Sequence, residues 1–86
     1  MNKNDLVSTV NQVLIRYDLE GLMSIGAPID EYEPEAIAIA DFIINNRKAT
    51  IEQLADDIQS TFIYYFSDFI DISLCIEMAE DIKEHF

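Results

Sequence analysis

Several residue types are scarce in this chain of 86 residues, which has one cysteine, two prolines, two glycines and no tryptophan. A single cysteine, Cys75, cannot form a disulfide within the chain, which is typical of proteins from a reducing compartment. No apolar run approaches the roughly 20 residues that a membrane-spanning helix needs. The first five residues are polar and lack the apolar core of a signal peptide. These absences predict a soluble, cytoplasmic protein.

Positive charge is also scarce. The chain has five lysines and arginines and 17 aspartates and glutamates, which gives a formal net charge of −12. Such a surface repels nucleic acid and anionic membranes, so neither is expected as a partner. The expected partner is a basic protein. Half of the residues are hydrophobic, among them five phenylalanines and four tyrosines, so the chain is not a disordered acidic tail. The length allows one domain, residues 1–86, with one modest core.

Hydrophobic residues recur at helical spacing in four segments. We expect helices over about 4–17, from 34 to about 46, over 51–69 and from 71 onward. Thr50 and Gln53 fit a capping box at the start of the third. Residues 62–66 also have the composition of a strand, but the helical pattern around them outweighs it. The predicted fold is all-α: a small four-helix bundle with a long acidic loop, 18–33, between helices one and two. Loops of this length are functional or disordered, and both readings stay open.

None of the acidic, cysteine or histidine residues forms a recognisable catalytic or metal-binding motif. The adjacent pairs Asp30–Glu31 and Asp56–Asp57 point in different directions, unlike the facing carboxylates of an acid–base site. Cys75 lies on an apolar helix face and is expected to be a buried, inert thiol. We therefore predict no enzyme, no metal and no cofactor.

Two stretches resemble the YugE-like family of small bacterial four-helix proteins. They are residues 17–22, Tyr-Asp-Leu-Glu-Gly-Leu, and residues 26–32, Gly-Ala-Pro-Ile-Asp-Glu-Tyr. In that family an aromatic-Asp-Pro-x-Gly-Leu turn ends helix one, and a Gly-Ala-Pro-x-Asp-Glu-Tyr loop leads to Glu-Ala, here Glu35-Ala36. Residues 52–58 and 75–82 are also similar, whereas Tyr17 replaces the typical Trp and Leu19 the typical Pro. The resemblance implies a four-helix fold and assigns no activity. The loop is also similar to those of some immunity proteins of bacterial toxin systems.

The aromatic run allows two interpretations. Phe62, Tyr65, Phe66 and Phe69 share the inward face of the predicted helix. Ile63 and Tyr64 point elsewhere, either to be buried against the acidic loop or another helix, or outward as an aromatic anchor for a partner. Tyr32, which is set among acidic residues, is a second candidate anchor.

The resulting functional prediction is a bacterial interaction protein, most concretely an immunity protein that blocks a basic toxin, such as a nuclease, through an acidic surface. The alternative is a stand-alone four-helix protein of unknown function that self-associates, as a homodimer, through surplus apolar surface. The expected partner-binding residues are Asp30, Glu31, Tyr32, Glu33, Glu35, Asp56, Asp57 and Tyr64.

Overall fold

The chain folds into four helices. The computed structural model describes residues 2–28 and 30–85, and Ile29 of the predicted loop lies outside them. The helices are α1 (Lys3–Tyr17), α2 (Glu33–Asn45), α3 (Ile51–Phe66) and α4 (Ile72–Lys83). No strand occurs among the described residues. The prediction of an all-helical fold with four helices is confirmed.

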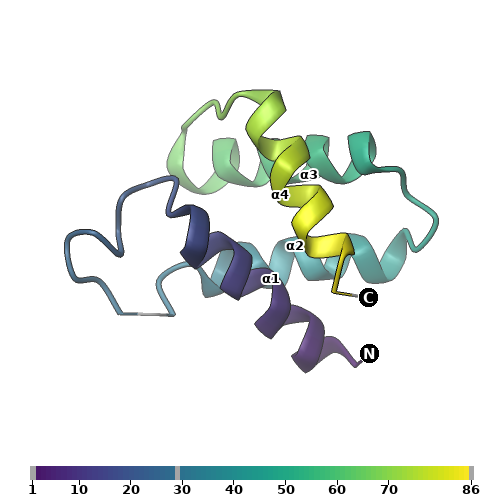
Figure 1. Cartoon of the computed structure of the whole chain (residues 1–86), viewed down its shortest axis with the longest axis horizontal. Coiled ribbons are helices and arrows are strands. Elements are labelled where there is room, and N and C mark those ends of the chain that lie inside the picture. The colour runs from purple at the N-terminus through teal and green to yellow at the C-terminus, as the bar shows by residue number, and fades with distance from the viewer. Residues whose placement is uncertain (1, 29, 86) are drawn as a thin grey trace.

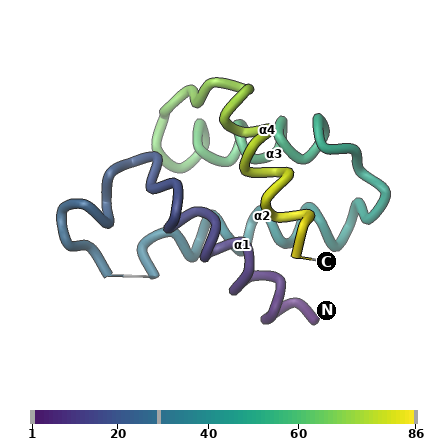
Figure 2. Tube along the Cα trace, in the orientation of Figure 1, coloured from purple at the N-terminus to yellow at the C-terminus, as the bar shows by residue number. Residues whose placement is uncertain are grey.

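Each helix packs against two others. Helix α2 contacts α1 and α3, and α4 contacts α3 and α1, so the four helices enclose a common interior. The connection between α1 and α2 and the turn between α3 and α4 lie on the same side of the molecule, at the left in Figure 1. The connection between α2 and α3 lies on the opposite side, as the tube in Figure 2 also shows.

Three of the helices are each capped by the side chain of the residue that precedes them, as the local sequence predicts. The Asn2 Oδ1 accepts a hydrogen bond from the Asp5 amide at 2.8 Å, and the Asp71 Oδ1 accepts one from the Ser73 amide at 2.8 Å. At α3 the predicted capping box is present in both directions. The Thr50 Oγ1 accepts from the Gln53 amide at 3.1 Å, and the Gln53 Oε1 accepts from the Thr50 amide at 2.9 Å. These bonds satisfy amides that the first turn of a helix leaves unpaired.

We expect the substitution Thr50→Ala to lower the free energy of unfolding by about 1 kcal/mol, because it removes the acceptor of the Gln53 amide. Urea denaturation followed by circular dichroism measures this. The matched control is Ser60→Ala on the exposed face of α3, which we expect to change stability by less than about 0.5 kcal/mol. Equal effects of the two substitutions would show that the cap contributes nothing.

All four helices supply the hydrophobic core. Fully buried side chains include Val10 and Val13 of α1, Ile39 of α2, Ile58 of α3 and Ile82 of α4. Cys75 of α4 is also fully buried, and burial raises the pKa of its thiol to about 11. The prediction of a buried thiol is confirmed, and a thiol with this pKa stays protonated at neutral pH.

The third helix ends earlier than its hydrophobic stripe predicts. Ser67 adopts a left-handed conformation, with φ of 53°, and its amide donates to the Ile63 carbonyl at 2.9 Å. The chain then turns back, and the Gln59 Nε2 donates to the Ile70 carbonyl at 2.8 Å. As a result Phe69 is 74% exposed and Tyr65 is 45% exposed. The prediction that both side chains face inward is wrong.

None of the helices in the described part of the chain is long and apolar enough to cross a bilayer.

Candidate functional site

The connection between α1 and α2 is organised by one carboxylate. Asp18 ends α1 in a left-handed conformation, with φ of 47°, which aspartate tolerates better than most residues. Its Oδ1 accepts hydrogen bonds from the Tyr32 hydroxyl at 2.8 Å and the Met23 amide at 3.0 Å. Its Oδ2 accepts from the Ser24 amide at 3.2 Å and the Ser24 hydroxyl at 3.1 Å. These donors, the Met23 amide foremost, lower the pKa of Asp18.

Tyr32, predicted to be an exposed anchor for a partner, is fully buried. Its ring lies against Phe62 and Phe66 of α3, with ring centroids 6.4 Å and 6.2 Å apart. Its hydroxyl donates to Asp18 and accepts from the Glu20 amide at 3.1 Å. The apolar ring is therefore in the core while the hydroxyl is satisfied by the connection, so Tyr32 stabilises the fold and is removed from the binding surface.

Glu35, another predicted partner-binding residue, is only 3% exposed in the first turn of α2. Its burial raises the pKa of its carboxyl group, and the charge of nearby Glu31 adds to this shift. Glu20 has a similar environment: burial and a side-chain hydrogen bond to Asp68 raise its pKa to about 7. Glu35 is therefore not available to a partner, and Glu20 lies near Asp68 of the turn between α3 and α4.

Five of the six remaining predicted residues fall into two groups, and the sixth, Asp57, is half-buried on α3. Asp30, Glu31 and Glu33 are exposed at the end of the connection and the start of α2. Asp56 and Tyr64 are exposed on α3 two turns apart, so they share one outward helix face with about 12 Å between them along the axis.

Members of the two groups line different pockets. Glu33 lines a shallow pocket with residues of α1, including Asn4 and Val7. Asp56 and Asp57 line a different pocket between α2 and α3. Glu33 and the two aspartates therefore lie in separate pockets.

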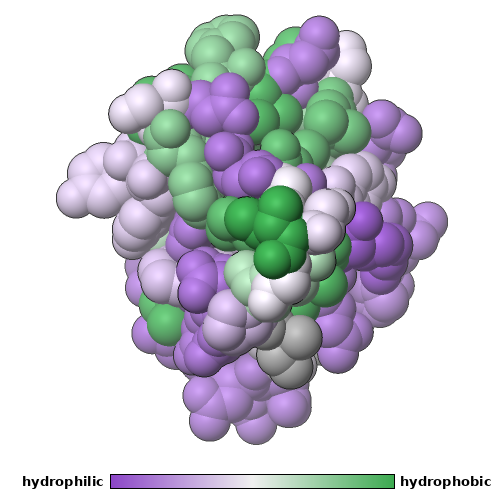
Figure 3. All heavy atoms as spheres, turned by 90° about the vertical axis from the view of Figure 1, so that its left-hand side faces the viewer, coloured by the Kyte–Doolittle hydropathy of each residue, from purple (hydrophilic) through white to green (hydrophobic). Residues whose placement is uncertain are grey.

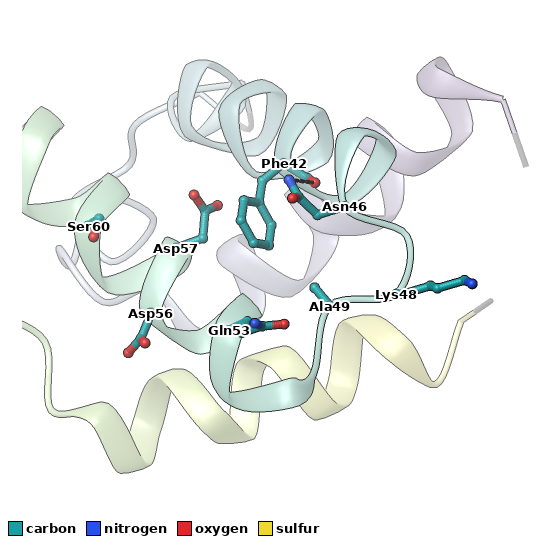
Figure 4. A pocket seen from close by; sticks show the side chains of 8 residues that line it. All are labelled: Phe42, Asn46, Lys48, Ala49, Gln53, Asp56, Asp57 and Ser60. Atoms are coloured by element: carbon teal, nitrogen blue, oxygen red, sulfur yellow. Dashed lines mark hydrogen bonds between the residues drawn. The ribbon is translucent and has the colours of Figure 1, made fainter.

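The pocket between α2 and α3 has a volume of about 530 Å³ and is open to solvent. Figure 4 shows its walls, which come from the end of α2, the following connection and the first half of α3. Its lining residues are Phe42, Asn46, Lys48, Ala49, Gln53, Asp56, Asp57 and Ser60. Sequence analysis identified its two aspartates and missed its aromatic wall, because Phe42 reads as an ordinary core residue of α2.

Asp57 is the most unusual group in this pocket. Its Oδ2 is buried and has no hydrogen-bond partner among the described residues. Burial raises the pKa of its carboxyl group to about 6. The side chain is half-buried as a whole, and leaving one of its oxygens buried without a partner disfavours the charged form.

A cluster of exposed hydrophobic residues, which sequence analysis did not find as a group, lies around the end of α3. We call Ile63, Tyr64, Tyr65, Phe69 and Ile72 the aromatic patch. Tyr64 is 81% exposed, and its ring packs edge-on against Tyr65 with centroids 5.0 Å apart. Figure 3 views the molecule from the side of the two chain turns, where hydrophobic side chains gather at the centre and towards the top among hydrophilic ones. The early end of α3 places Phe69 in this patch.

Groups that support chemistry are few among the described residues. His85 is exposed near the end of the chain, and Cys75 is buried. No group of three or more histidine, cysteine, aspartate or glutamate side chains in the described ranges is arranged to hold a metal ion. The features that could act are therefore exposed carboxylates, the pocket between α2 and α3, and the aromatic patch.

Comparison of the chain with protein-family models, curated proteins and solved structures finds no match. The resemblance to the YugE-like family stays a prediction.

Proposed function

We propose that the chain is a protein-binding module for a basic protein, and most concretely an immunity protein that blocks a basic toxin, such as a nuclease. The observation that carries this proposal is the formal net charge of −12. Many of the carboxylates responsible, including those of Asp30, Glu31, Glu33 and Asp56, are exposed. A large negative charge on a small folded protein accelerates association with cationic partners and opposes association with anionic ones.

The cations that could neutralise this charge are mostly engaged elsewhere. Lys3 pairs with Asp41 at 2.9 Å, and Arg16 pairs with Asp81 at 3.1 Å. The Lys83 Nζ donates to the Ala49 carbonyl at 2.6 Å. The exposed carboxylates are therefore free to take the place of nucleic-acid phosphates before the lysines and arginines of a nuclease, and occupation of that surface would block its substrate.

The test is a comparison of the natural chain with the triple variant Asp30→Lys/Glu31→Lys/Glu33→Lys as baits for lysate of the source organism at low salt. We expect the natural chain to retain a basic protein that elutes at high salt and whose activity the free chain inhibits. The variant should associate with the retained protein at least tenfold more slowly than the natural chain does, because its net charge is more positive by six units.

The matched control is Glu77→Lys/Glu80→Lys/Glu84→Lys, which makes the same change in charge. Its three positions are exposed, two in α4 and one just after it. An equal loss in both variants would indicate long-range attraction without a local site. Retention unaffected by either variant would contradict the proposal.

Self-association is the second candidate function, and the aromatic patch is the observation that favours it. Exposed hydrophobic clusters commonly mark interfaces. The high net charge opposes it, since each copy carries the same negative surface.

A further inference from the structure

The aromatic patch lies in a stretch of the chain that carries no positive charge. Within the described chain, seven large hydrophobic residues are exposed, and five of them fall between positions 63 and 72. Segments 18–32 and 63–72 contain no lysine, arginine or histidine. The same two segments contain six acidic residues: Asp18, Glu20, Asp30, Glu31, Asp68 and Asp71.

Contacts in the core bring these two segments together. Tyr32, at the end of the first, packs on Phe66 of the second, and Glu20 lies near enough to Asp68 for that group to raise the pKa of Glu20. In sequence, Asp68 precedes and Asp71 follows Phe69, which is 74% exposed in the turn between α3 and α4. The turn between α3 and α4 thus presents an exposed aromatic side chain with acidic residues next to it in the chain.

We infer that the aromatic patch is the docking surface for a basic amphipathic segment of a partner protein, whose apolar side chains cover Tyr64 and Phe69 while its lysines and arginines meet the surrounding carboxylates. This inference rests on the proposed function and adds the place and the chemistry of the contact. Aromatic side chains ringed by polar groups are typical of the residues that dominate binding energy. A second copy of the chain is a poor occupant, because it would bring the same carboxylates against this side.

Two synthetic helical peptides test the inference. One carries leucine on one face and lysine on the other; the second has alanine in place of leucine, so both have the same charge. Fluorescence anisotropy at about 150 mM salt measures their affinity for the natural chain. We expect the leucine peptide to bind at least tenfold more tightly, and the double variant Tyr64→Ser/Phe69→Ser to lose that difference while keeping its affinity for the alanine peptide.

The control is Ile37→Ser, which removes an exposed hydrophobic residue of α2 outside the patch and should leave both affinities unchanged. Equal binding of the two peptides, or a leucine preference that survives the double variant, would overturn the inference while leaving the proposed function intact. Failure of both peptides to bind even at low salt would instead contradict the proposed function. A stable dimer in light scattering that the double variant dissociates would assign the patch to a second copy and overturn the inference.

Discussion

Replacement of Tyr32 by alanine is expected to lower the free energy of unfolding by about 3–5 kcal/mol, the range for large aromatic residues removed from a core. The ring is fully buried against Phe62 and Phe66, and its removal leaves a cavity between the connection and α3. It also removes the hydroxyl that links Asp18 to the Glu20 amide. A domain of this size has a total stability of roughly 4–13 kcal/mol, so this variant could be largely unfolded.

The variant Tyr32→Phe keeps the ring and removes only the hydroxyl, so it tests the same contacts in a folded protein. We expect a loss of about 1–2 kcal/mol, since the Glu20 amide and one position on Asp18 lose their partner. Urea denaturation measures both variants. Amide hydrogen exchange at Met23 and Ser24 should accelerate in Tyr32→Phe, because the carboxylate that holds these amides is less well fixed.

Tyr64→Ala is the matched control, because Tyr64 is 81% exposed and its removal should change stability by less than about 0.5 kcal/mol. The two tyrosines should therefore separate cleanly, with Tyr32 affecting stability and Tyr64 affecting binding. Full stability of Tyr32→Phe with unchanged exchange at Met23 would contradict the role assigned to the hydroxyl.

The local features of the fold could be predicted from neighbouring residues. Thr50 and Gln53 are three positions apart, and the capping box needs nothing beyond them. The stripe from Leu54 to Phe62 faces the interior because its spacing matches one helix face. In each case the interactions that decide the structure lie within a few residues in sequence.

The features that sequence analysis missed depend on distant contacts. Tyr32 is surrounded by acidic residues in sequence, and only the approach of Phe62 and Phe66, thirty or more positions later, buries it. No glycine follows Phe66 to indicate in the sequence that α3 ends there, because Ser67 adopts the left-handed conformation instead. This single turn decides whether Phe69 belongs to the core or to the candidate binding surface.

Acidification from pH 8 to about pH 5 is expected to stabilise the protein. Burial, the hydrogen bond to Asp68 and nearby negative charge raise the pKa of Glu20 to about 7, and burial raises that of Asp57 to about 6. Burial also raises the pKa of Glu35. In the unfolded chain these groups release their protons near pH 4. Between about pH 4.5 and 7 the native state therefore holds protons that the unfolded state has lost, so stability falls as pH rises through this window.

Asp18 has the opposite effect below this window. Its pKa is lowered in the native state, so the stability that it contributes is present above its unfolded pKa and is lost as pH falls through its folded value. Stability should consequently pass through a maximum near pH 4–5. Thermal unfolding measured across this range by circular dichroism locates the maximum.

The variant Glu20→Gln assigns this dependence to one group. Glutamine is uncharged at every pH and can still donate a hydrogen bond to Asp68, so it mimics protonated Glu20. Because the side chain is partly exposed, solvent screening reduces the effect, and we expect a gain of about 1 kcal/mol at pH 8 and none at pH 4.5. The control Glu80→Gln removes an exposed carboxylate of α4 and should produce no comparable difference between the two pH values. An identical gain from both variants at pH 8 would attribute the dependence to net charge and not to the burial of Glu20 beside Asp68.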